Sequence, residues 1–270
     1  MPRSRGTTPT AREAVADIAR IGGFFDVTSH PDLADSAPGE GPWRPLAEVW
    51  GPDVLGSRIE RTRRLFAERM DITPEEVEPR VAASVLYQGM AARLVSPAMA
   101  AAVVHGVVPE PGALRWRTIS TGPLPLLLAE DRAVPAPRPR EHGPAAAAEV
   151  VERVVVQGLL EPAAAAFRAR VKVSPKVLTG NLASSVAGAA RRIAEVRPEH
   201  GADAHALAGA LVAAPSLEGS GTFGPPRTVT GARGGSHREI QFVRNSCCLY
   251  YRLPGGGMCA DCVLLRGVDA

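Results

Sequence analysis

The residues of this sequence that could carry chemistry are its four cysteines, which all lie near the C-terminus. Cys247, Cys248, Cys259 and Cys262 follow the pattern C-C-x10-C-x2-C, and no other position of the 270-residue chain holds a cysteine. Thiolates are soft ligands, and four of them together favour an iron–sulfur cluster or zinc. The spacing therefore predicts a metal centre in this segment.

The spacing alone leaves the kind of centre open. Structural zinc usually takes its cysteines as two C-x(2–4)-C knuckles around one ion, which suits Cys259 and Cys262. It suits Cys247 and Cys248 less well, because neighbouring side chains in extended backbone point to opposite faces. Two diverging thiolates can instead serve a larger object with two iron atoms, around which the glycines at 255–257 let the chain bend. Disulfides or redox-active thiols are the third interpretation.

The cysteine segment is similar to that of a known family. Residues 246–252, followed by the second cysteine pair, resemble the C-terminal signature of the FhuF-like ferric siderophore reductases. In that family the same C-C-x10-C-x2-C spacing holds a [2Fe–2S] cluster. The resemblance therefore implies this cofactor, with Cys247, Cys248, Cys259 and Cys262 as its ligands. A second, less specific resemblance covers residues 174–185, around Asn181.

The resemblance also implies an activity. Hard siderophore oxygens bind ferric iron much more tightly than ferrous iron, so a one-electron reduction of Fe(III) to Fe(II) releases the metal. The expected protein is a ferric-siderophore reductase of the cytoplasm that serves iron transport. Because the sequence has no G-x-G-x-x-G after a strand and no P-loop, we expect electrons from a protein donor such as a ferredoxin or flavoprotein. The alternatives are an iron–sulfur sensor or electron carrier without a siderophore substrate, and a zinc-knuckle interaction module.

Residues outside the four cysteines could tune the reduction potential of such a centre. A [2Fe–2S] cluster held by four thiolates is an anion, so nearby positive charge and N–H donors favour its reduced form. Arg244, Arg252 and Arg266 lie close to the cysteines in the sequence. We expect Arg244 and Arg252, together with Asn181, to be near the cluster, and Arg266 to be a solvated charge.

Composition narrows the classes of partner. The chain has 31 basic and 28 acidic residues, which is too balanced to predict binding to nucleic acid. The most apolar run, residues 97–108, is too short to span a bilayer, and the N-terminus lacks the apolar segment of a secretory signal. We therefore expect no nucleic-acid partner and no membrane span. With only 4% aromatic residues, the core must rest on Ala, Val and Leu.

The elements that must position the cysteines predict an α+β fold that is predominantly α-helical. We expect an N-terminal region, residues 1–140, that is helical with a small β-hairpin near residues 114–128, where apolar and polar residues alternate. The proline-rich stretch 134–140 marks the predicted boundary. The C-terminal region, residues 141–270, is predicted to be helical and to end in the cluster-binding motif at 244–265.

Local signals predict where the helices begin and end. Capping boxes, in which Ser or Thr precedes Glu by three residues, predict helix starts at residues 10–13 and 57–60. A further helix is expected from Pro74, with a restart at Pro97, because proline cannot continue the hydrogen-bond ladder. The second half should contain helices over residues 145–160, 162–171, 174–195 and 198–214. A long exposed loop over residues 215–236 and a short strand over 239–243 should then lead to the cysteines.

Overall fold

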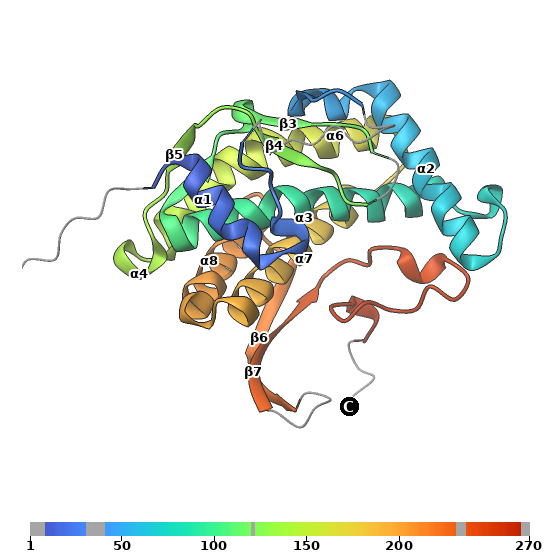
Figure 1. The fold of residues 1–270 in the computed structure, drawn as a ribbon. Coiled ribbons are helices and arrows are strands. Elements are labelled where there is room, and N and C mark those ends of the chain that lie inside the picture. Colours follow the sequence, from blue (N-terminus) through green and yellow to red (C-terminus); the bar gives the residue numbers. More distant parts are fainter. Residues whose placement is uncertain (1–8, 31–40, 120–121, 231–235, 266–270) are drawn as a thin grey trace, which may run out of the picture.

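The computed structural model describes residues 9–30, 41–119, 122–230 and 236–265. A long helix, α3 (Pro79–His105), runs through the middle of the helical body, and helices from both halves of the chain pack around it (Figure 1). Alanine and valine are its commonest residues, and most of its residues are buried. A helix that is buried on most sides shows no single apolar face, which explains why α3 is rich in Ala and Val throughout.

Helix α3 differs from the sequence prediction at two prolines. It does not restart at Pro97 but continues through it to His105. A proline inside a helix costs about 3 kcal/mol, and burial of Val95, Ala98 and their neighbours in the core offsets that cost. The helix also begins at Pro79 rather than Pro74, because the residue before a proline disfavours helical backbone.

The N-terminal helices pack against α3. Helix α1 (Ala11–Ile18) begins at the predicted capping box, in which Thr10 Oγ1 accepts from the Glu13 N–H and the Glu13 carboxylate accepts from the Thr10 N–H. Helix α2 (Pro52–Met70) begins five residues before Ser57. The prediction that a capping box at residues 57–60 starts this helix was therefore wrong. Pro52 provides the start instead, because its fixed φ suits the first helical position.

The second half of the chain is helical, as predicted. The short helix α4 (Pro139–His142) leads to α5 (Pro144–Val151), which continues without a break through a π-helical segment (Glu152–Leu160) into α6 (Glu161–Arg170). Helices α7 (Pro175–Val196) and α8 (Gly201–Ala213) follow. Helix α7 lies alongside α3, and α8 covers α7 and α5.

Two small antiparallel sheets lie on the helical body. Strands β1 (Arg44–Pro45), β3 (Leu114–Trp116) and β4 (Leu126–Leu128) form one, and β2 (Val107–Pro109) pairs with β5 (Ala133–Pro135) in the other. The pairing of β3 with β4 confirms the hairpin predicted near residues 114–128. The fold is therefore α+β and predominantly helical, as the sequence predicts.

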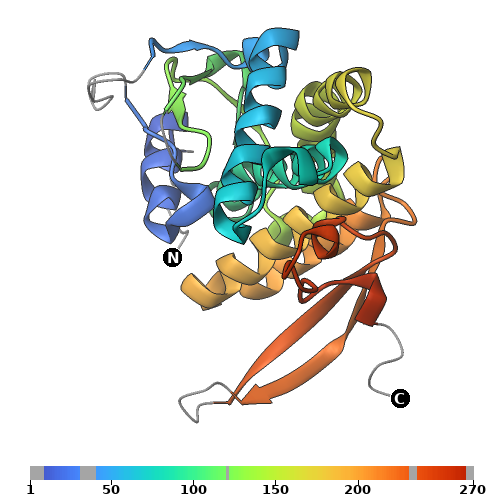
Figure 2. The ribbon, with the colours of Figure 1, turned by 90° about the vertical axis from the view of Figure 1, so that its right-hand side faces the viewer.

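A third sheet delivers the chain to the cysteines. Strands β6 (Gly221–Thr230) and β7 (Ser236–Arg244) form a long hairpin that projects from the helical body (Figure 2). The predicted loop over residues 215–236 was wrong for residues 221–230, which form β6, whereas residues 215–220 are turns and residues 231–235 lie outside the described residues. The predicted strand over 239–243 is confirmed and extends further. A register shift between Phe223 and Pro226 accommodates the two prolines of β6, which an edge strand tolerates because their missing N–H groups need no partner there.

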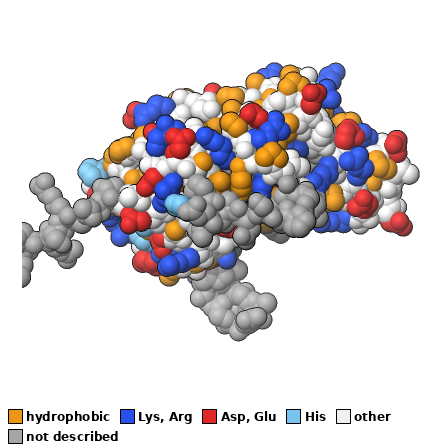
Figure 3. All heavy atoms as spheres, turned by 45° about the horizontal axis from the view of Figure 1, so that its top comes forward, with side chains coloured by type: hydrophobic (Ala, Val, Ile, Leu, Met, Phe, Trp, Pro, Cys, Tyr) orange, Lys and Arg blue, Asp and Glu red, His pale blue; other side chains and the backbone are white. Residues whose placement is uncertain are grey.

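The interior forms one hydrophobic cluster that includes residues from both halves of the chain. Tyr87 of α3 and Phe167 of α6, for example, pack edge to face with ring centroids 5.4 Å apart. The predicted boundary near residue 140 stays a prediction. On the face shown in Figure 3, acidic and basic side chains are interspersed with apolar ones. None of the helices in the described part of the chain is long and apolar enough to cross a membrane.

Candidate metal centre

The cysteine segment folds back onto the end of β7 and onto the helical body (Figure 2). The backbone N–H of Arg244 donates to the carbonyl oxygen of Asp261 at 3.1 Å, so the two ends of the segment lie side by side. A short 3-10 turn, Tyr250–Arg252, packs between them, and the Tyr250 ring meets Phe66 of α2 edge to face at 6.0 Å. The two cysteine pairs are therefore brought together by tertiary contacts.

The four sulfurs form two pairs, each with one cysteine from either half of the motif. The Sγ atoms of Cys248 and Cys259 lie 3.5 Å apart, and Cys247 and Cys262 also contact each other through their thiols. All four are free thiols, and Cys248 and Cys262 are buried. Among the described residues, no three His, Cys, Asp or Glu side chains gather closely enough to hold a single ion. Two pairs of thiols would suit a [2Fe–2S] cluster, which is held by four cysteine thiolates.

A left-handed residue explains how adjacent cysteines reach different partners. Leu249 has φ 71°, which is rare for a residue with a side chain. The chain therefore turns sharply directly after Cys248. The Leu249 N–H donates to Cys247 Sγ at 3.3 Å, and the Tyr250 N–H donates to the Cys248 sulfur. The turn thus separates the two sulfurs and gives each of them a backbone donor.

Arg244 is the buried cation of this site, with no exposed side-chain surface. Its Nη2 donates to Cys259 Sγ at 2.6 Å and to Asp261 Oδ1 at 3.2 Å, and its Nη1 donates to Asn181 Oδ1 at 2.8 Å. The Nε atom lies 3.0 Å from Asp261 Oδ2 but does not have the angle of a hydrogen bond. The guanidinium therefore holds a sulfur, a carboxylate and an amide at once.

The amide of Asn181 extends this contact into the helical body. Asn181, on α7, is fully buried, and its Nδ2 donates to the carbonyl oxygen and the Oγ of Ser84 on α3. Ser84 Oγ in turn donates to the carbonyl oxygen of Cys248 at 2.7 Å. A continuous set of hydrogen bonds thus runs from Cys248 through Ser84, Asn181 and Arg244 to Cys259. Buried polar networks make an arrangement rigid when their members are satisfied, and here Arg244 Nε is the one buried side-chain atom of the network without a hydrogen bond in the described structure.

The electrostatics of the site follow from these contacts. Burial alone would lower the pKa of Arg244, but Asp261, Cys248 and Cys259 raise that pKa above its ordinary value. The hydrogen bond from Cys259 lowers the pKa of Cys248, and the pKa of Cys259 is raised in turn. Burial raises the pKa of Cys247. The lowered pKa of Cys248 favours the thiolate form that metals bind.

The residues that the sequence suggested as neighbours of the cluster do not all lie at the sulfurs. Arg244 and Asn181 lie together at the sulfurs, whereas Arg252 is exposed and pairs with Glu78 at 2.6 Å. Arg266 lies outside the described residues. Ser84 was not considered from the sequence; it lies 164 positions before Cys248, and no local pattern marks it.

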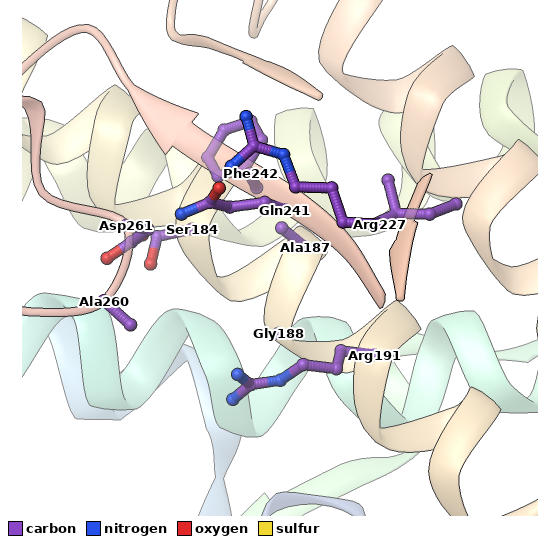
Figure 4. A pocket seen from close by; sticks show the side chains of 10 residues that line it. Ser184, Ala187, Gly188, Arg191, Arg227, Gln241, Phe242, Ala260 and Asp261 are labelled. Carbon is purple, nitrogen blue, oxygen red and sulfur yellow. The ribbon is translucent and has the colours of Figure 1, made fainter. Parts of the chain in front are cut away.

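A cavity of about 480 Å³ lies beside the cysteine segment, between α7 and the β6–β7 hairpin (Figure 4). Part of its wall is made by Ala260 and Asp261, which lie between the last two cysteines. Arg191 of α7 and Arg227 of β6 line it from different elements. Its other walls come from α7 and β7: Ser184, Ala187, Gly188, Ile240, Gln241 and Phe242.

Comparison with known families agrees with this geometry. A family model described as the FhuF 2Fe-2S C-terminal domain matches residues 244–264, which include Arg244 and all four cysteines. The match confirms the resemblance that the cysteine spacing suggested, and it indicates a [2Fe–2S] cluster as the cofactor. No curated protein matches the chain.

Proposed function

We propose that the protein is a cytoplasmic ferric-siderophore reductase, in which Cys247, Cys248, Cys259 and Cys262 hold the [2Fe–2S] cluster. When bound, the cluster supplies a centre that takes up and gives off one electron at a time. The observation that carries the proposal is the cavity beside the cysteine segment, because residues 260 and 261 belong both to its wall and to the motif. A substrate in this cavity would lie directly against the loop that holds the ligands.

The chain's own residues have separable roles in this proposal. Arg244 balances the negative charge of the sulfurs from the buried side. Arg191 and Arg227 present positive charge and N–H donors to the cavity, and Gln241 adds an amide. Such groups suit the oxygen-rich surface of a ferric siderophore. Electrons would come from a protein such as a ferredoxin or flavoprotein.

The test is rapid mixing of the reduced holoprotein with ferric siderophores under anaerobic conditions. We expect the visible absorption of the oxidised cluster to return at a rate that saturates with the concentration of a ferric hydroxamate or catecholate. A ferrous chelator in the mixture should report the released iron. If none of several siderophores re-oxidises the cluster, the reductase is excluded and the sensor or electron carrier is the better description.

A further inference from the structure

A second cavity, of about 520 Å³, lies between helix α2 and the chain that leaves strand β3. None of the residues that line it belongs to the cysteine segment. Three arginines of α2, Arg58, Arg61 and Arg64, give it one polar wall. The rest of the lining is mainly apolar and includes Val54, Leu65, Leu86, Trp116, Ile119 and Pro123.

The arginines concentrate positive charge that the protein does not neutralise. They stand three residues apart, so they follow neighbouring turns of the helix. Asp53 is the one acidic side chain among the described residues of the lining, and within the described structure neither Arg58 nor Arg64 forms an ion pair. Burial, and then the charge of Arg61, lower the pKa of Arg58 to about 10. An anion between these side chains would relieve that repulsion.

Two buried hydrogen-bond donors of this cavity also lack an acceptor in the described structure. They are Nε of Arg58 and Nε1 of Trp116, whose side chain is only 1% exposed. Buried donors in proteins are nearly always satisfied. Both residues belong to the lining of the same cavity, so a small shift of either side chain would bring its donor to a ligand with acceptor oxygens.

We propose that this cavity binds an organic anion that combines a carboxylate or phosphate head with an apolar body. The planar forks of the arginines match the oxygens of either head group. Leu65, Ile119 and Pro123 offer apolar surface for the body. The volume lies within the range of small-molecule sites in proteins.

The proposal is tested by calorimetric titration of the full-length holoprotein with four probes. Phenyl phosphate and benzoate carry the two head groups on one apolar ring, inorganic phosphate lacks the ring, and benzylamine carries the opposite charge. We expect at least one of the aromatic anions to bind saturably, inorganic phosphate at least tenfold more weakly, and benzylamine not at all. Whichever aromatic anion binds more tightly identifies the head group. Failure of both to bind, or equal binding of inorganic phosphate, overturns the assignment.

Matched variants of α2 locate the site. Arg58→Gln and the exposed Arg64→Gln should each weaken binding of the preferred anion at least fivefold. Arg69→Gln removes the same charge from the same helix outside the cavity and should leave binding unchanged. Without ligand, Arg58→Gln should raise the melting temperature, because it removes a half-buried cation that forms no ion pair in the described structure. Equal effects of Arg58→Gln and Arg69→Gln on binding would contradict the proposal.

Discussion

At the scale of single residues, the site depends on Arg244. A guanidinium with no exposed surface needs partners for its charge, and here they are a sulfur, the Asp261 carboxylate and the Asn181 amide. Asp261 neutralises part of the charge, so the sulfurs feel less than a full positive unit. The remaining positive charge still favours added negative charge at the sulfurs, because the Arg244 side chain is buried and its charge is therefore poorly screened by water.

Replacing this residue should lower the reduction potential. We expect Arg244→Gln to keep part of the cluster and to shift the midpoint potential down by roughly 100 mV, since a unit charge about 5 Å away at an effective dielectric of about 20 is worth about 3 kcal/mol before Asp261 offsets it. The measurement is a redox titration followed by EPR. Arg252→Gln is the matched control, because Arg252 is exposed and pairs with Glu78. Equal shifts of the midpoint potential in the two variants would show that Arg244 affects the potential no more than an exposed arginine does.

At the scale of elements, the loop between the two cysteine pairs depends on close backbone approach at Gly256. A Cβ atom at this position would collide with the carbonyl oxygen of Tyr250 and lie 3.0 Å from that of Leu253. Both obstacles are backbone, so they cannot move without changing the loop. The Gly256 N–H also donates to the Leu253 carbonyl at 2.8 Å, which closes the turn.

Gly256→Ala should therefore reduce the amount of cluster bound more than it reduces helical structure. We expect iron and acid-labile sulfide per chain to fall at least twofold while the far-ultraviolet circular dichroism stays within error. Gly209→Ala, on α8, is the control, because a Cβ atom there meets nothing within 4 Å. Full cluster content in Gly256→Ala would show that the loop adapts to the extra carbon.

Elements with local signals could be predicted from the sequence, and those made by distant contacts could not. Helix α1 carries its own capping box, and α7 its own proline start, so both were found. Strand β6 is rich in Gly, Pro and Thr and reads as a loop; it is a strand because β7 pairs with it. Pro97 ends an isolated helix but not one buried in a core.

The same distinction holds for the site. The cysteine spacing predicted that the four cysteines act as a group, because residue type and spacing are local properties, and their role as ligands stays a prediction. The role of Ser84 depends on the packing of α3 against the cysteine segment, which no local pattern encodes. Asn181 was found through a resemblance, and its contact with Arg244 emerges only from the fold.

At the scale of the whole molecule, the cavity beside the cysteines exists because α7, the β6–β7 hairpin and the C-terminal segment meet there (Figure 4). If the cavity binds a siderophore, as we propose, its two arginines should make binding depend on the charge of the siderophore. Gallium complexes test this separately from electron transfer, since Ga(III) replaces Fe(III) without being reduced. The double variant Arg191→Gln/Arg227→Gln should bind an anionic gallium catecholate about five- to tenfold more weakly, at about 0.5 kcal/mol for each exposed charge.

A neutral gallium hydroxamate should be much less affected by the same double variant. The control is Arg69→Gln/Arg168→Gln, which changes the net charge equally with exposed residues outside the cavity. If both double variants weaken binding of the anionic gallium complex equally, the complex does not bind in this cavity. The re-oxidation experiment would still decide independently whether the protein is a reductase.

The body of the molecule is also held by a charged contact between its first helix and two later elements. Asp17 of α1 accepts from Nη2 of Arg197, directly after α7, at 2.8 Å, and lies 2.9 Å from Nε2 of His105, the last residue of α3. Arg20 adds a longer ion pair of 3.8 Å. Burial would raise the pKa of Asp17, but the hydrogen bonds from Arg197 and His105 together lower it below the ordinary 3.8.

This contact predicts a pH dependence of stability with a definite sign. Because the folded pKa of Asp17 lies below the unfolded one, its contribution is fully present above the unfolded value of 3.8 and is lost as the pH falls through the folded value. Asp17→Asn should lower the melting temperature by about 2–4 °C at pH 7, equivalent to about 1 kcal/mol. The difference from the unchanged protein should shrink as the pH falls below 3.8. Glu68→Gln, an exposed carboxylate on α2, is the control and should show a smaller difference at pH 7. A difference for Asp17→Asn that stayed constant down to the acid limit of folding would mean that the carboxylate charge does not carry the contact.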